Sequence, residues 1–190
     1  MSKVKQGSKE YLNYQKKVET GKTILMFVIS LTLFFSGWFF MKTKANAFTI
    51  ISVLGILPAS NSAVSMIMYL KAKGGSESFF AKLDSYKKDL IHAYNFVITT
   101  RDLAYEVPSV VVKNSFICGC TIKEYKEKSL LEAHIKDLLA KNGYVVTVKM
   151  FDKEALYFEE LQKLTTLKES DEESMQRDLK IMEILGRLSL

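Results

Sequence analysis

The chain has 190 residues, a net charge of +6 and only two Cys, too few for the disulfide framework of a small secreted domain. Its basic excess is local: residues 1–83 carry 11 Lys and three Glu, whereas residues 84–190 carry 16 basic and 18 acidic residues. The excess therefore surrounds the two apolar stretches described below, which favours attraction to anionic inner-leaflet lipids of a bilayer and argues against a specific nucleic-acid partner.

The first 22 residues are rich in Lys and contain no long apolar run. Within them Tyr11, Tyr14 and Val18 recur at the spacing of one helix face. Two interpretations stay open. Residues 1–22 form a short amphipathic helix on the inner leaflet of a membrane, or they form a frayed basic tail.

Two uncharged stretches follow, each long enough to cross a bilayer as a helix. Residues 23–41 are 19 residues without a charge, and residues 45–70 are 26. A helix needs about 20 apolar residues to cross the hydrocarbon core. A cleaved signal peptide has a shorter apolar run, of about 7–15 residues, and no second stretch directly after it. The sequence therefore predicts a two-helix transmembrane hairpin over residues 23–70.

The flanking lysines predict the orientation of this hairpin. Six Lys precede the first stretch and three follow the second, whereas only Lys42 and Lys44 lie in the turn. Cytoplasmic flanks carry the excess of Lys and Arg. We therefore expect a multi-pass protein with two spans and both termini in the cytoplasm. Trp38, Phe39 and Phe40 would then lie at the outer interface.

The second stretch combines small residues with a predicted bend. Gly55, Ala59 and Ala63 recur every four residues, and we expect them to form a helix-packing interface. Pro58 is expected to bend the helix, and Asn61 adds an amide beside the bend. This polar kink predicts either a docking face or pathway, or only a bent helix that packs on the first stretch.

Beyond the second stretch, residues 71–78 are expected to be a linker and residues 79–190 one cytosolic α/β domain. The apolar patterns predict the element order αβββαβαα, and hence a mixed four-stranded sheet flanked by helices. The expected elements are a helix over 78–92, strands over 94–100, 107–113 and 116–122, a helix between 129 and 143, a strand over 144–151, a helix from 152 to 164 and a last helix from 170 onward.

Short motifs predict several element ends in this domain. Asn114–Ser115 between two β-rich runs predicts a two-residue hairpin turn. Pro108 is expected near the start of its strand, where a missing N–H is tolerated. Ser129–Glu132 and Ser170–Glu173 have the spacing of capping boxes, and Gly143 is expected just after the end of a helix.

The two thiols are weak candidates for a metal site. Cys118 and Cys120 point to one face of a strand, and His92 and His134 could complete a zinc site in composition. However, zinc ribbons and fingers use C-x2-C pairs, and the spacing here is C-x-C. Thiols buried in a core strand explain the pattern better, so we expect no metal and no cofactor.

The αβββαβ order over about residues 84–150 resembles the core of restriction-endonuclease-like nucleases. That resemblance implies an acid at the start of the second strand and an acid-x-Lys on the third, which hold Mg²⁺ and activate water. Here Thr121–Lys123 supplies the Lys without the acid, and Glu106 precedes the second strand. Pro108 stands where the better-placed metal ligand would be. The alternative catalytic pair is therefore Glu106 and Lys123, and a fold of this type kept for binding is the better interpretation.

The sequence contains no phosphate-binding loop, dinucleotide fingerprint, nucleophile elbow or zincin motif. We therefore expect a non-enzymatic membrane protein whose cytosolic domain binds a partner or ligand as an adaptor or regulatory module. Its partner would be another protein or a second copy of itself. Two alternatives stay open: a membrane-tethered nuclease-like hydrolase using Glu106 and Lys123, and a subunit of an oligomeric transporter or channel assembled around Pro58 and Asn61.

Overall fold

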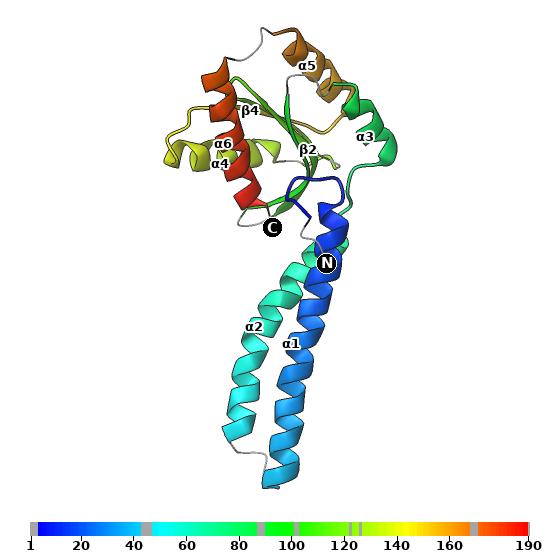
Figure 1. The fold of residues 1–190 in the computed structure, drawn as a ribbon, viewed down its shortest axis with the longest axis vertical. Helices are drawn as coiled ribbons and strands as arrows, with labels where there is room; N and C mark the ends of the chain where they lie inside the picture. The colour runs from blue at the N-terminus through cyan, green and yellow to red at the C-terminus, as the bar shows by residue number, and fades with distance from the viewer. Residues whose placement is uncertain are drawn as a thin grey trace. The chain divides into compact units, whose positions relative to one another are not determined.

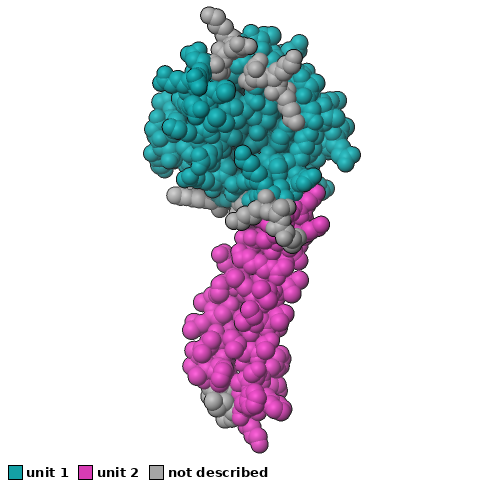
Figure 2. Space-filling view, in the orientation of Figure 1, with its two compact units in different colours: residues 1–11, 73–190 teal, residues 12–72 magenta. Residues whose placement is uncertain are grey.

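The computed structural model describes residues 4–42, 47–86, 90–100, 103–121, 123–125, 127–167 and 171–189. They form two compact units, Leu12–Ala72, here called the hairpin unit, and Met1–Tyr11 with Lys73–Leu190, here called the α/β unit (Figures 1 and 2). In chain order the elements are α1 (Tyr11–Met41), α2 (Ala47–Lys71), α3 (Glu77–Asp84), β1 (Ile91–Thr99), β2 (Ala104–Lys113), β3 (Phe116–Cys120), α4 (Lys128–Lys141), β4 (Thr147–Phe151), α5 (Glu154–Thr166) and α6 (Glu172–Leu188).

The α/β unit is built on one four-stranded mixed sheet with the order β1-β2-β3-β4. The first two pairings are antiparallel, and β3 and β4 run parallel. The predicted order and the mixed sheet are therefore confirmed. Asn114 and Ser115 make the predicted turn between β2 and β3, with φ of 50° and 61°, and two positive φ values are what a type I′ turn requires.

Helices cover both faces of this sheet, with α4 and α6 on one face and α3 and α5 on the other (Figure 1). The core under α4 and α6 includes Ile117 and Leu139, and the core under α3 and α5 includes Leu83, Cys118 and Leu161. All five are fully buried. Burial of an aliphatic side chain of this size contributes about 1.5–3 kcal/mol, so the two cores hold the three layers together.

The prediction that Pro108 lies near the start of its strand is wrong. β2 begins at Ala104, and Pro108 lies in the middle of this central strand. The pairs Tyr94–Ser109 and Phe96–Val107 place Asn95 opposite Pro108. Asn95 has a φ of 55°, in the left-handed region. A local break in the ladder at Asn95 therefore lies opposite the proline, where no N–H can be donated.

The helix predicted over residues 78–92 is shorter in the structure. α3 ends at Asp84, and Ile91 already pairs with Val112 as the first residue of β1. Apolar residues near this boundary fit a helical and a strand period equally well in sequence. Pairing with β2, which is distant in the chain, decides between the two.

The capping box predicted at Ser129–Glu132 is not formed. α4 begins at Lys128, and the Glu132 carboxylate instead accepts the N–H of Met150 at 2.8 Å, which caps the outer edge of β4. α6 begins at Glu172 after Asp171, and Ser170 lies outside the described residues. The predicted role of Gly143 is confirmed: its φ is 84°, just past the end of α4.

The hairpin unit consists of α1 and α2, which are long and apolar enough to cross a membrane by length and composition. Residues 11–22 are the first turns of α1, so this segment is helical but is not a separate helix. Residues 4–10, also expected to be part of the basic N-terminal segment, belong to the α/β unit.

Candidate functional site

The contact between α1 and α2 is made of small and hydroxylated residues. Thr23 and Ser30 on α1 are buried, as are Ser52 and Ser62 on α2. The hydroxyls of Thr23 and Ser62 share a hydrogen bond of 2.9 Å. Ala59 is completely buried. Small side chains let the two backbones approach closely, and the shared hydrogen bond satisfies two polar groups at the contact.

Two of the three residues predicted for helix packing lie at this contact. A Cβ atom at Gly55 would lie 2.8 Å from the hydroxyl oxygen of Ser30, so glycine is needed where the helices approach. Ala59 is buried, and Ala63 is half-buried. The four-residue pattern missed the hydroxyl positions. Their signal in sequence is a seven-residue spacing, as between Ser52 and Ala59 or Thr23 and Ser30.

Pro58 and Asn61 lie on a different face of α2. Both are exposed, and so is Leu54 on the same face. The Asn61 amide makes no hydrogen bond to any described residue. By contrast, the exposed hydroxyl of Thr32 on α1 donates to the Val28 carbonyl of its own helix at 2.7 Å. The residues of the predicted polar kink therefore lie outside the α1–α2 contact.

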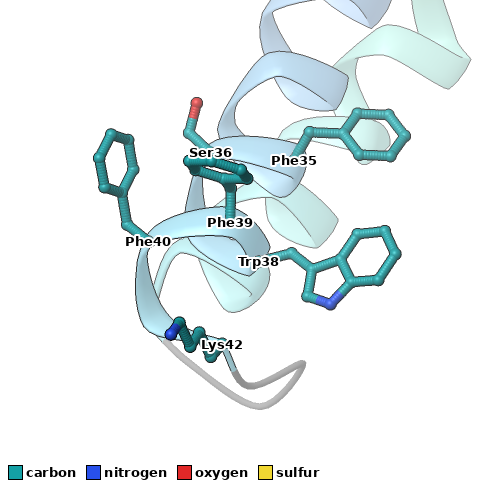
Figure 3. Close-up of a pocket in the computed structure, with 6 residues that line it drawn as sticks. All are labelled: Phe35, Ser36, Trp38, Phe39, Phe40 and Lys42. Atoms are coloured by element: carbon teal, nitrogen blue, oxygen red, sulfur yellow. The ribbon is translucent and has the colours of Figure 1, made fainter.

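The end of α1 presents a recess of about 740 Å³ lined by aromatic rings (Figure 3). Phe39 and Phe40 are each 81% exposed. In the close-up, Phe35 and Trp38 point to one side of the helix and Phe40 to the other, with Lys42 at the helix end. Aromatic rings beside a Lys are typical of a helix end at a membrane–water interface.

In the α/β unit, the alternative catalytic residues do come together. Lys123 Nζ lies 3.0 Å from Glu106 Oε1, and this hydrogen bond raises the pKa of Lys123. The other carboxylate oxygen of Glu106 accepts the backbone N–H of Lys73 at 2.8 Å. Both oxygens are thus occupied. No cluster of three or more His, Cys, Asp or Glu that could hold a metal occurs among the described residues.

The thiols are buried as predicted. Cys118 and Cys120 lie under α3 and α5, and burial raises the pKa of both, that of Cys120 to about 12. A thiol is a nucleophile only as thiolate, so neither residue is a reactive cysteine near neutral pH.

The α/β unit has a groove that the sequence patterns did not predict. It has a volume of about 640 Å³ and is formed by the N-terminal segment, β1 and α6. Gln6 reaches across and donates to the carbonyls of Gly186 and Ser189. The buried Ala93 and Phe96 and the exposed Lys5, Gln6 and Glu183 line it, so both apolar and polar groups face the groove. No local sequence signal predicts it, since its walls are far apart in the chain. Its other lining residues include His92, Leu179 and Met182.

The Asn95 side chain binds two segments that are distant in the sequence to β1, the edge strand of the sheet. Its amide nitrogen donates to the carbonyl of Lys9 at 2.8 Å, and its amide oxygen accepts the N–H of Gly75 at 3.2 Å. The N–H of Tyr94 donates to the Gly7 carbonyl at 2.9 Å. Residues 4–10 and 73–76 are therefore held on the α/β unit and are not loose connections.

No protein family, curated protein or solved structure matches the chain. The function of the chain is therefore inferred from the contacts, burial and charges of its own residues.

Proposed function

We propose that the protein is a two-span membrane protein, with both termini in the cytoplasm, whose α/β unit is a non-catalytic binding module. The observation that carries the membrane part is the reversed arrangement of residues in the hairpin unit. Hydroxylated residues such as Thr23 and Ser62 are buried between the helices, while large apolar side chains such as Leu57 and Phe39 face outward. In water this arrangement loses the hydrophobic contribution of every outward side chain, about 25 cal/mol per Å². In hydrocarbon it loses none.

Charge supports the proposed orientation. Lys16, Lys17 and Lys22 lie on the first turns of α1, and Lys71 ends α2, so the basic residues gather at one end of the pair. Each Lys near an anionic leaflet contributes about 1 kcal/mol of attraction. The aromatic end of α1 would then lie at the opposite interface.

Alkaline carbonate extraction of membranes from cells that express the full chain tests integration. We expect the protein to stay in the pellet after carbonate and to enter the supernatant only with detergent. A peripheral protein would be released by carbonate, and that result would contradict the membrane assignment.

Labelling with a membrane-impermeant maleimide tests orientation. The native thiols are buried, so single introduced cysteines can be read against a low background. Lys42→Cys should be labelled from outside intact cells, and Val145→Cys only after permeabilisation. The reverse pattern would place both termini outside.

The binding part of the proposal is supported by the groove between the N-terminal segment, β1 and α6. Apolar side chains with a few polar groups at the rim are usual in binding sites. Purification of the full chain from native membranes in mild detergent, followed by mass spectrometry, should recover a stoichiometric companion or ligand. Leu179→Glu, on the groove wall, should abolish that recovery.

Met175→Glu is the matched control for this experiment. Met175 is exposed on the same helix to a similar extent and does not line the groove. Equal recovery with both variants would show that the companion binds elsewhere.

A second candidate function, a membrane-tethered nuclease-like hydrolase, has one observation in its favour, the contact between Glu106 and Lys123. Metal-dependent hydrolysis uses carboxylates that converge on the metal, and here both oxygens of Glu106 are already hydrogen-bonded. Incubation of the full-length protein with DNA or RNA and Mg²⁺ or Mn²⁺ should give no cleavage. Cleavage that disappears in Lys123→Ala would instead favour the hydrolase.

A further inference from the structure

One face of α2 is left uncovered by α1 and carries polar groups. Leu54, Pro58, Asn61 and Ser65 recur at i, i+4, i+7 and i+11, which places them on a single face of a helix. The first three are exposed and Ser65 is half-buried. The residues that contact α1 lie about 100° around the helix, at 3.6 residues per turn. We call these four residues the Asn61 stripe.

Among the described residues, the stripe has one side-chain amide without a hydrogen bond and one backbone carbonyl without its usual helical N–H donor. The Asn61 amide offers two donors and one acceptor, and it bonds to none of the residues that the structure describes. Pro58 has no N–H to donate to the carbonyl of Leu54 one turn earlier. In hydrocarbon no water is present to satisfy either group, and each unsatisfied group costs several kcal/mol.

We propose that a second copy of this chain binds the Asn61 stripe and that the two copies form a twofold-symmetric dimer in the membrane. An amide is complementary to itself, because its N–H group and its oxygen each match the opposite group of an identical amide. Two copies with the same orientation, related by a twofold axis along the membrane normal, bring Asn61 opposite Asn61 of the second copy. Two reciprocal hydrogen bonds then form. This inference rests on the proposed function, because its driving force exists only in hydrocarbon, in a bilayer or a detergent micelle.

The Asn61 stripe fits a proton or ion pathway less well than it fits a dimer contact. The stripe contains no ionisable side chain, and pathways through membranes are marked by such groups. A self-complementary amide instead matches the way in which polar residues hold helices together in membranes.

The first test measures self-association of the full chain in detergent micelles by sedimentation equilibrium. Asn61→Leu should weaken dimerisation at least tenfold, because it removes both reciprocal hydrogen bonds and a tenfold change in the dissociation constant corresponds to only about 1.4 kcal/mol. Asn61→Gln keeps the amide and should retain most of the affinity. Ser60→Ala is the control, because Ser60 is exposed on α2 outside the stripe.

The second test locates the interface in intact membranes by disulfide formation. Leu54→Cys lies on the stripe and should give a disulfide-linked dimer under mild oxidation. Ile56→Cys is also exposed but points away from the stripe, and it should not. The native Cys118 and Cys120 are buried and do not contribute.

The outcomes separate this inference from the proposed function. Carbonate-resistant protein that is monomeric, or whose association is unchanged by Asn61→Leu, overturns the dimer and leaves the membrane assignment standing. A different membrane protein that co-purifies with the wild type and is lost with Asn61→Leu overturns the second copy as the occupant. Protein released by carbonate overturns both.

Discussion

The two units of this chain bury opposite kinds of residue. The α/β unit has fully buried aliphatic residues such as Ile117 and Leu139 between its sheet and helices. The hairpin unit has Thr23, Ser30 and Ser62 inside and most of its large apolar side chains outside. A single chain in a single solvent would show one rule of burial. The contrast supports the proposal that the hairpin unit lies in a bilayer and the α/β unit in water, and substitutions that have opposite effects in the two units test it.

The largest effect is expected from truncating a buried aliphatic side chain of the α/β unit. Leu139→Ala removes a fully buried side chain and should lower the free energy of unfolding by about 2–5 kcal/mol. Leu130→Ala, on the same helix but half-exposed, should cost much less. Chemical denaturation in detergent, followed by circular dichroism, measures both. Equal losses would mean that the α4 side of the sheet is not a packed core.

A charge on an exposed apolar position should act differently in the two units. Leu57 is 68% exposed in the middle of α2, and Val145 is 92% exposed just before β4. Leu57→Lys should cost about 2.5–3.5 kcal/mol of membrane insertion, while Val145→Lys should leave folding and insertion unchanged. The carbonate-resistant fraction of each variant is the readout. If Leu57→Lys inserts as well as the wild type, the outward surface of α2 does not face lipid.

Inside the α/β unit, a buried carboxylate offers a smaller test. Asp178 is almost fully buried on α6 and accepts the backbone N–H groups of Asn114 at 2.6 Å and Ser115 at 2.9 Å. Asp178→Ala removes two hydrogen bonds from the exposed Asn114 and the half-buried Ser115 to a charged acceptor, and it should cost about 1–3 kcal/mol. The exposed Gln176→Ala on the same helix is the control, and its thermal unfolding should match the wild type. If Asp178→Ala unfolds at the same temperature as the wild type, water has replaced the carboxylate as the acceptor.

The smallest effect concerns acid stability. The hydrogen bond from Lys128, with Nζ at 3.0 Å from the carboxylate, holds the pKa of Asp152 below its ordinary value of 3.8. A lowered pKa stabilises the fold above pH 3.8, and that stabilisation is lost as the pH falls through the lower, folded-state value. Lys128→Met should therefore cost under about 1 kcal/mol at neutral pH and reduce the loss of stability in acid. Lys141→Met, which breaks the more exposed pair with Asp137, is the control.

Local signals in the sequence predicted much of the fold, and long-range contacts account for what they missed. The turn at Asn114–Ser115 and the glycine at Gly143 depend only on neighbouring residues, and both predictions are confirmed. Glu132 has the spacing of a capping residue, but a strand edge 18 residues away takes its carboxylate. That competition does not appear in a local pattern.

For the candidate sites too, local sequence patterns predicted some residues and long-range contacts account for those that were missed. The spacing of Gly55 and Ala59 marked where α2 contacts α1, because helix faces repeat over short distances. The groove involving Gln6 and Leu179 was missed, because its walls come from the two ends of the chain. Glu106 and Lys123 were expected as a pair from element order, and the structure places them in contact. Element order did not predict that the backbone N–H of Lys73 donates to the second oxygen of the same Glu106 carboxylate.

The amide of Asn95 has a practical consequence for work on the α/β unit. Because one side chain holds both Lys9 and Gly75, the α/β unit is discontinuous in sequence, and residues 12–72 are an insertion within it. Cutting the chain after α2 would strip the outer edge of β1 of the backbone that covers it at Gly7. A splice that joins residue 9 to residue 75 through a few glycines would keep that edge covered and remove the helices. The α/β unit should therefore be isolated by excising the helices from within the chain, and not by trimming from the N-terminus.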